Sequence, residues 1–148
     1  MRRVAASAIV DRSPERVWDL YADVSGTVEW LPFVEAILQV SGPAGPGQTY
    51  RERTRFLGLA DVSDWRVIGW DRPRRQVHRS TGKLLDIELV IEIERTGEGA
   101  RIRQEARLRS RMPAILGRFH EAAGGFVAEL GLRQAVAAAK HRLEEAGV

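Results

Sequence analysis

The stretch Leu84–Ser110, LLDIELVIEIERTGEGARIRQEARLRS, decides the fold class of this chain. Within it, Leu84–Glu94 and Ala100–Ser110 alternate apolar with charged residues on either side of a turn at Gly97–Gly99. A period of two is typical of half-buried antiparallel strands. One predicted outer row is acidic and the other is basic, so we expect cross-strand charge pairs that each contribute about 0.2–1 kcal/mol.

The same period continues toward the N-terminus and predicts five more strands. These are Arg3–Val10, Glu35–Val40, Gln48–Phe56, Ala60–Trp70 and Arg74–Thr81. Two short helices interrupt the series after the first strand. Ser13 is the predicted N-cap of the first helix, with Pro14 at its first helical position. The second begins at Val28 and ends at Leu31, because the residue before a proline disfavours the α conformation.

A helical period returns after Met112–Pro113 and predicts one long helix over Ala114–Ala146. At 1.5 Å per residue this helix would span roughly 48 Å, which is enough to cross a whole sheet. The Gly124–Gly125 pair lies within it, and we expect a local bend there. Its predicted buried stripe is formed mainly by large apolar residues: Ile115, Leu116, Phe119, Phe126, Val127, Leu130 and Ala137.

Composition narrows the possible classes of function. The length of 148 residues fits one domain, residues 1–148. Cysteine is absent, which excludes disulfides and thiolate chemistry and favours a reducing compartment. The net charge of +3 comes from 23 basic residues interleaved with 20 acidic ones, so we expect no nucleic-acid partner. Since the sequence contains no recognisable leader and no apolar run of spanning length, we expect a cytoplasmic protein without stable membrane insertion, either a monomer or a homodimer.

Three segments resemble motifs of one known superfamily. They are VDRSPERVW (Val10–Trp18), WLPFV (Trp30–Val34) and WRVIGWDRPRR (Trp65–Arg75). Together with the order of the predicted elements, they make the whole chain similar to the START-like, polyketide cyclase/dehydrase (SRPBCC, helix-grip) superfamily. The resemblance implies an α+β helix-grip fold. In that fold a curved antiparallel sheet wraps around the long C-terminal helix and leaves a deep cavity.

The resemblance also implies a small hydrophobic ligand that is aromatic, polyketide-like or lipid-like, and it requires no cofactor. Because these motifs describe architecture, three classes of function remain open. The first is a cyclase or dehydrase, which convergent Glu, Arg and His side chains in the cavity would favour. The second is a non-catalytic carrier or sensor, which a wholly apolar cavity would favour. The third is a stress-type or toxin-type interaction module that uses the outer sheet face, and a filled cavity would favour it.

Glu52 is the first candidate for chemistry. It lies with Tyr50 and Thr54 on the less charged face of a predicted strand whose other face carries Arg51 and Arg53. An unpaired carboxylate on that face is costly, so Glu52 should have a partner or a raised pKa. The functional interpretation is a general acid or base, or a hydrogen-bond anchor for a ligand, and the structural one is an ion pair with an arginine of a neighbouring strand; both remain open. Tyr50 is a candidate donor to an enolate oxygen.

The direction of the side chains in Ala60–Trp70 is open between two assignments. In the first, Asp64 and Arg66 share the parity of Trp70 and point toward the cavity. In the second, Trp65 and Val67 point inward instead. An inward Arg66 would hold a carboxylate, phenolate or enolate oxygen of the ligand, because its guanidinium is a permanent fork of donors.

The remaining site candidates are aromatic, polar and apolar residues expected along the cavity. The catalytic candidates are Glu52, Arg66 and Tyr50, and the ligand-binding candidates are Trp30, Phe33, Thr54, Phe56, Asp64, His78, Leu89, Gln104, Phe119, His120 and Phe126. A single histidine on an apolar face is more often a packing residue than a functional one. No spacing of histidines and carboxylates fits a metal, so we expect neither a metal site nor a cofactor.

Overall fold

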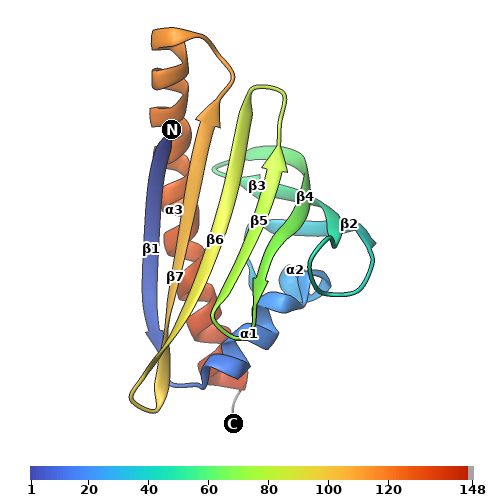
Figure 1. Ribbon diagram of the computed structural model, residues 1–148, viewed down its shortest axis with the longest axis vertical. Coiled ribbons are helices and arrows are strands. Elements are labelled where there is room, and N and C mark those ends of the chain that lie inside the picture. Colours follow the sequence, from blue (N-terminus) through green and yellow to red (C-terminus); the bar gives the residue numbers. More distant parts are fainter. Residues whose placement is uncertain (147–148) are drawn as a thin grey trace.

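A curved, seven-stranded antiparallel sheet wraps around one long helix in the computed structural model, which describes residues 1–146 (Figure 1). The strands are β1 (Arg2–Val10), β2 (Val34–Ser41), β3 (Thr49–Phe56), β4 (Leu59–Asp71), β5 (Arg75–Thr81), β6 (Leu85–Thr96) and β7 (Gly99–Ser110). The helices are α1 (Pro14–Ala22), the short 3-10 helix η1 (Val24–Gly26), α2 (Thr27–Trp30) and α3 (Ala114–Ala146). The predicted α+β helix-grip fold is therefore confirmed.

The strand order leaves an open side between the sheet and α3. The order is β1-β7-β6-β5-β4-β3-β2, and each strand runs antiparallel to its neighbours. Helix α3 packs mainly on β1 and β7, at one edge of the sheet. The strands β2, β3 and β4 lie toward the other edge and curve away from the helix (Figure 1). Side chains on the concave face of β3–β6 can therefore line a cavity.

Local sequence signals set the ends of the short helices. The Ser13 hydroxyl accepts a hydrogen bond from the Arg16 backbone N–H at 3.3 Å, and Pro14 occupies the first turn of α1. Leu31, which precedes Pro32, adopts an extended conformation with φ −93° and ψ 111° and ends α2. Both boundaries agree with the sequence analysis.

The β6–β7 pair confirms the predicted ladder of opposite charges. Glu88 lies opposite Arg107, and Glu92 lies opposite Arg103, with Arg103 Nη1 3.3 Å from Glu92 Oε1. These side chains are on the outer face of the sheet. Such solvated pairs stabilise a fold only weakly.

The first half of α3 differs from its prediction. Its large apolar side chains face outward, with Phe119 69% and Phe126 65% exposed. The helix instead contacts the sheet through small residues. A methyl group on Gly125 would come within 2.8 Å of Arg2 Cγ, and one on Gly124 within 3.3 Å of Leu108 Cδ2. The close approach of helix and sheet therefore favours small residues at these two positions, and the larger side chains lie away from the contact.

The second half of α3 forms part of the core. Val136, Ala139 and Leu143 pack with Val17 and Trp18 of α1 and with buried residues of β6 and β7. The helix is continuous over Ala114–Ala146, including the Gly124–Gly125 pair. None of the helices within residues 1–146 combines the length and the apolar character that a membrane crossing demands.

Candidate functional site

A cavity of about 310 Å³ lies between the concave face of the sheet and α3. Its volume is at the lower end of the range for small-molecule sites. The lining side chains from α1, η1, α2 and the segment after them are Tyr21, Val24, Thr27, Trp30, Leu31 and Phe33. The sheet contributes Tyr50, Glu52, Thr54, Phe56, Asp61, Ser63, Trp65, His78, Ile87, Leu89, Ile91, Gln104 and Ala106. Helix α3 contributes Val127, Ala128, Gly131, Leu132 and Ala135.

Aromatic rings form much of the wall. The rings of Phe33 and Phe56 meet edge to face with centroids 5.6 Å apart. Tyr50 and Trp65 lie nearly parallel, with an interplanar angle of 9° and centroids 6.4 Å apart. Flat, rigid walls of this kind suit a ligand that contains a ring.

Helix α3 keeps its side of the cavity open by presenting small residues. Ala128, Gly131 and Ala135 face the space. A Cβ atom placed on Gly131 would meet no other heavy atom within 4 Å. No other atom of the described chain therefore fills the space next to Gly131.

Glu52 is the unusual polar group of the cavity. It is half-buried by exposed area and lines the cavity. Burial raises the pKa of Glu52 to about 7; the Trp65 indole lowers this pKa in part, and the Asp61 carboxylate raises it again. The Trp65 Nε1 atom is nevertheless without a hydrogen bond of ordinary geometry to any acceptor within residues 1–146. Glu52 therefore has a weak donor nearby and, among the described lining residues, no cation.

A hydrogen-bonded chain runs from the cavity into the sheet. The Tyr50 hydroxyl lies 2.8 Å from His78 Nδ1, and His78 Nε2 lies 2.9 Å from Gln76 Oε1. Desolvation lowers the pKa of His78 to about 4, so the imidazole is neutral near pH 7. A proton on Nε2 satisfies both contacts, because His78 then donates to Gln76 and accepts from Tyr50. Burial, and then the charge of Glu52, hold the pKa of Tyr50 well above its ordinary value.

Two further polar groups face the cavity. The Tyr21 hydroxyl donates to Gln104 Oε1 at 2.9 Å, and burial raises the pKa of Tyr21 far above its ordinary value. The indole N–H of Trp30, like that of Trp65, is buried without a hydrogen-bond acceptor among the described residues. Both indoles line the cavity, so a bound molecule with oxygen acceptors could satisfy them.

Most of the predicted site residues lie along this cavity. The structure brings together Glu52, Tyr50, Trp30, Phe33, Thr54, Phe56, His78, Leu89 and Gln104. Five others do not line it: Arg66, Asp64, Phe119, His120 and Phe126. His120 is bound to Ser110, with its Nδ1 2.7 Å from the hydroxyl oxygen. Phe119 and Phe126 are on the outward face of α3.

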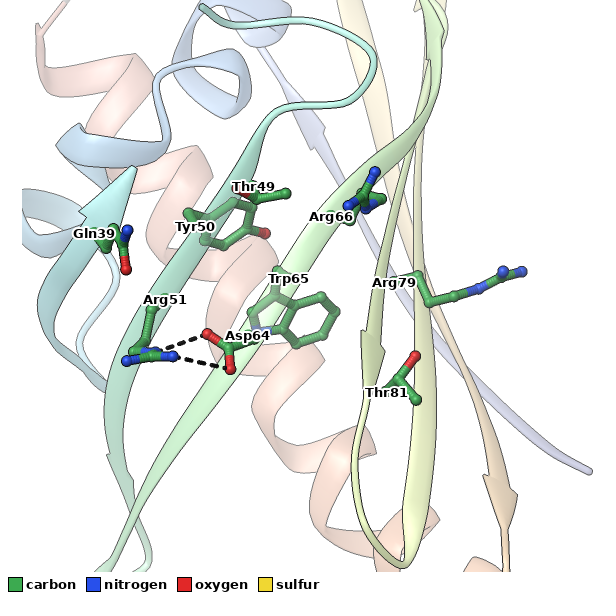
Figure 2. Close-up of a pocket in the computed structure, with 9 residues that line it drawn as sticks. All are labelled: Gln39, Thr49, Tyr50, Arg51, Asp64, Trp65, Arg66, Arg79 and Thr81. Carbon is green, nitrogen blue, oxygen red and sulfur yellow. Dashed lines mark hydrogen bonds and ion pairs between the residues drawn. The ribbon is translucent and has the colours of Figure 1, made fainter. Parts of the chain in front are cut away.

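The inward direction considered for Asp64 and Arg66 is wrong. Arg51 Nε contacts Asp64 Oδ1 at 2.7 Å on the outer face of the sheet, and Arg66 lies directly across from Arg79 of β5. Figure 2 shows these side chains along a shallow outer groove, with α3 behind the strands. Arg66 therefore cannot hold a ligand oxygen inside the cavity.

A bulge in β4 explains this error. The register with β5 shifts between Val67 and Gly69, which reverses the parity of the side chains. Trp70 packs inward against Trp18, with ring centroids 4.8 Å apart, and Trp65 also points inward although it is five residues away. The alternative parity that the sequence left open, with Trp65 inward, is the correct one.

Sequence reasoning omitted Asp61, Ser63 and Trp65 from the site. The signal that indicates them is Gly69, since an isolated glycine inside a strand often marks a bulge. Among residues 1–146, no group of three or more His, Asp or Glu side chains is arranged to hold a metal ion.

Comparison with known proteins gives a family match over nearly the whole chain. A family model described as polyketide cyclase / dehydrase and lipid transport matches residues 1–145. An uncharacterised protein of Mycobacterium tuberculosis is 31% identical over 84 residues, which make up 56% of this chain and 59% of that protein. The matched part thus spans 59% of the length of this curated relative.

Solved structures share the architecture at low identity. The Zhui aromatase/cyclase from Streptomyces sp. R1128 has a TM-score of 0.85 at 16% identity, covering 99% of this chain and 96% of that chain. A START superfamily protein from Mycobacterium smegmatis has a TM-score of 0.79 at 15% identity, covering 97% of this chain and 98% of that chain. At such identities the likeness shows a shared fold alone.

Proposed function

Because this chain belongs to the polyketide cyclase/dehydrase and lipid transport family, we propose that its cavity binds a small hydrophobic molecule containing a ring, and that Glu52 transfers a proton on that molecule. The observation that carries the proposal is a carboxyl group that has no cationic partner among residues 1–146, in a cavity walled by aromatic rings. A structural ion pair would leave Glu52 with an arginine, and a passive carrier needs no carboxyl group at this position.

The acidity of Glu52 suits proton transfer near neutral pH. Since burial raises the pKa of Glu52 to about 7, its acid and base forms are both populated there. General acid–base groups work best when their pKa lies close to the working pH. In a cyclase-type reaction, the Glu52 carboxylate would take a proton from the carbon next to a ligand carbonyl. The resulting enolate carbon would attack a second carbonyl, and Glu52 would return the proton to the new alkoxide.

Neutral donors would stabilise the developing charge in this scheme. With Arg66 on the outer face, the cavity offers the indole N–H groups of Trp30 and Trp65. Neutral donors aimed at a developing oxyanion in a site with little water still lower the barrier. The cavity walls would also hold a flexible ligand in a reactive conformation.

A non-catalytic carrier is the second candidate function. The apolar residues Ile87, Leu89 and Ile91 on the floor of the cavity favour it, since they suit any lipid-like molecule. The open volume disfavours a module that acts only through the outer sheet face.

Native mass spectrometry of freshly purified protein, followed by denaturing extraction, tests whether a ring compound or lipid co-purifies. Glu52→Gln should still bind an uncharged ring compound but lose turnover of a polyketone substrate, while Asp64→Asn on the outer face should retain both. A clean apo mass, with no thermal shift across an aromatic and lipid panel, would refute ligand binding. Unchanged turnover in Glu52→Gln would refute proton transfer by Glu52, whereas ligand binding without turnover in the parent protein would leave only the carrier.

A further inference from the structure

We propose that the cavity selects ligands that carry a protonated amine and rejects carboxylate ligands of the same size, with Glu52 as the residue that discriminates. This inference rests on the proposed ligand-binding function and adds the charge of the ligand to it. It also predicts that the missing cation beside Glu52 is supplied by the bound molecule.

The charged groups that line the cavity are all acidic. Glu52 and Asp61 face the space from β3 and β4, and no lysine or arginine is among the lining residues within the described chain. His78 adds no positive charge, because desolvation lowers its pKa to about 4. The electrostatic field in the cavity therefore favours cations and opposes anions.

Arginines are abundant nearby but point the other way. Arg51, Arg53 and Arg55 alternate with Glu52 along β3 and lie on its exposed face. Arg51 Nε contacts Asp64 Oδ1 at 2.7 Å. Two contacts join the other arginines to Glu35, at 3.6 Å from Arg53 and 3.2 Å from Arg55. The arginines of β3 thus pair with outer carboxylates of β2 and β4, while Glu52 on the inner face has no cationic partner among the described residues.

The walls around Glu52 are compatible with a bound ammonium group. Trp65 lies next to it, and the face of Tyr50 stacks on Trp65 at 6.4 Å. An ammonium within about 6 Å of an aromatic face gains from the ring quadrupole, most strongly for tryptophan. A carboxylate and aromatic faces together therefore offer an amine both a counter-charge and a desolvated surface.

The titration of the cavity gives this selection a pH dependence. The groups facing Glu52 are Asp61 of β4, Tyr50 of β3, His78 of β5 and Tyr21 of α1, and α3 faces the cavity with residues that do not titrate. The pKa of His78 is lowered to about 4, and burial raises the pKa of each tyrosine above its ordinary value. Since the pKa of Glu52 is about 7, its ionised form grows as the pH rises through that value. The preference for an amine should grow with it.

Three probes with one skeleton test the proposal on the full chain: 2-naphthylmethylamine, 2-naphthalenemethanol and 2-naphthoate. Calorimetric titration near pH 8 should give the amine an affinity at least about tenfold higher than the neutral alcohol, with the carboxylate weaker than both. Near pH 5.5 the amine and the alcohol should differ by less than about threefold, because Glu52 is then mostly protonated.

Two variants assign the effect to one residue. Glu52→Gln should bind the alcohol as the parent does and lose the preference for the amine, and its binding of the alcohol shows that it is folded. Asp64→Asn, a matched change on the outer face, should keep the preference.

Equal binding of the three probes by the parent, or a preference that persists in Glu52→Gln, would overturn the charge selection while leaving ligand binding intact. If no probe of any charge binds, the proposed function fails together with the inference.

Discussion

The two faces of the β3–β4 hairpin treat charge in opposite ways. On the outer face, Arg51 and Asp64 form a solvated pair with side chains 48% and 69% exposed. On the inner face, directly beside this pair along the strand, Glu52 faces a cavity whose described lining contains no cation. Water solvates both charges of the outer pair, so the pair contributes little to stability. Ionisation of the unpaired inner carboxyl group is costly, because that group is partly removed from water. The proposed function rests on this contrast between the two faces.

Among the substitutions that test this comparison, replacement of Glu52 by glutamine should change stability the most. The folded-state pKa of about 7 lies above the ordinary 4.5, so the folded protein holds the proton more tightly than the unfolded chain does. The stabilising contribution of protonated Glu52 is therefore fully present below about pH 4.5, and it is lost as the pH rises through 7. Near pH 8, Glu52→Gln should be more stable than the parent by up to about 3 kcal/mol. Urea unfolding of both proteins at pH 4.5 and pH 8 measures this difference. A difference in free energy of unfolding between variant and parent that is the same at the two pH values would contradict the prediction.

Substitutions of His78 and Arg79, neighbours in β5 that face opposite sides of the sheet, should show the next largest difference in stability. His78→Leu breaks the chain from Tyr50 to Gln76 and leaves two buried polar groups unsatisfied, so it should lower the free energy of unfolding by about 2–3 kcal/mol. Arg79→Leu removes an exposed contact with Glu88 and should cost much less. Chemical denaturation of both variants compares the two faces of one strand, and similar losses would show that the inner chain is not structurally important.

Removal of the outer carboxylate should have a small effect. Asp64→Asn breaks the Arg51 contact in solvent, where the pair contributes little. We expect a melting temperature within about 2 °C of the parent. Differential scanning calorimetry measures it, and a larger drop would mean that the outer pair anchors the hairpin.

Replacement of Arg66 should have the smallest effect. Since its side chain lies on the outer face across from Arg79, Arg66→Gln should leave the affinity for a cavity ligand within about twofold of the parent. Titration with 2-naphthylmethylamine tests this prediction. A tenfold loss of affinity would contradict the prediction and would indicate that Arg66 contacts the ligand.

The order of the elements and the inner face of β3 were predictable because their patterns are strict. Tyr50, Glu52 and Thr54 alternate with arginines without interruption, and arginine-rich faces meet water. The strands β6 and β7 are equally regular, so their register and their charge ladder followed from the sequence.

The direction of β4 was not predictable from parity alone. Its outer face carries exposed apolar residues such as Val62 and Ile68, while Asp61 and Ser63 face the cavity. Hydrophobicity therefore does not separate the two faces, and the bulge before Gly69 reverses the parity set by Trp70. Only knowledge of the pairing with β5 resolves the choice.

The prediction of which side of α3 contacts the sheet was wrong for a different reason. A hydrophobic stripe assumes that the largest apolar residues are buried, but close packing of a helix on β1 and β7 selects glycine and alanine instead. The large side chains of Phe119 and Phe126 are thereby displaced to the surface. Their presence in the predicted site followed from the same assumption.

Gly131 shows how this fold can change what it binds during evolution. Alanine would favour the helix by about 1 kcal/mol over glycine, and a methyl group at this position meets no neighbour. Successively larger side chains at this point would shrink the cavity in small steps without disturbing the layers of the core. The range of molecules accepted can thus drift through single substitutions that preserve folding at every stage, so relatives with the same architecture can come to accept ligands of different sizes.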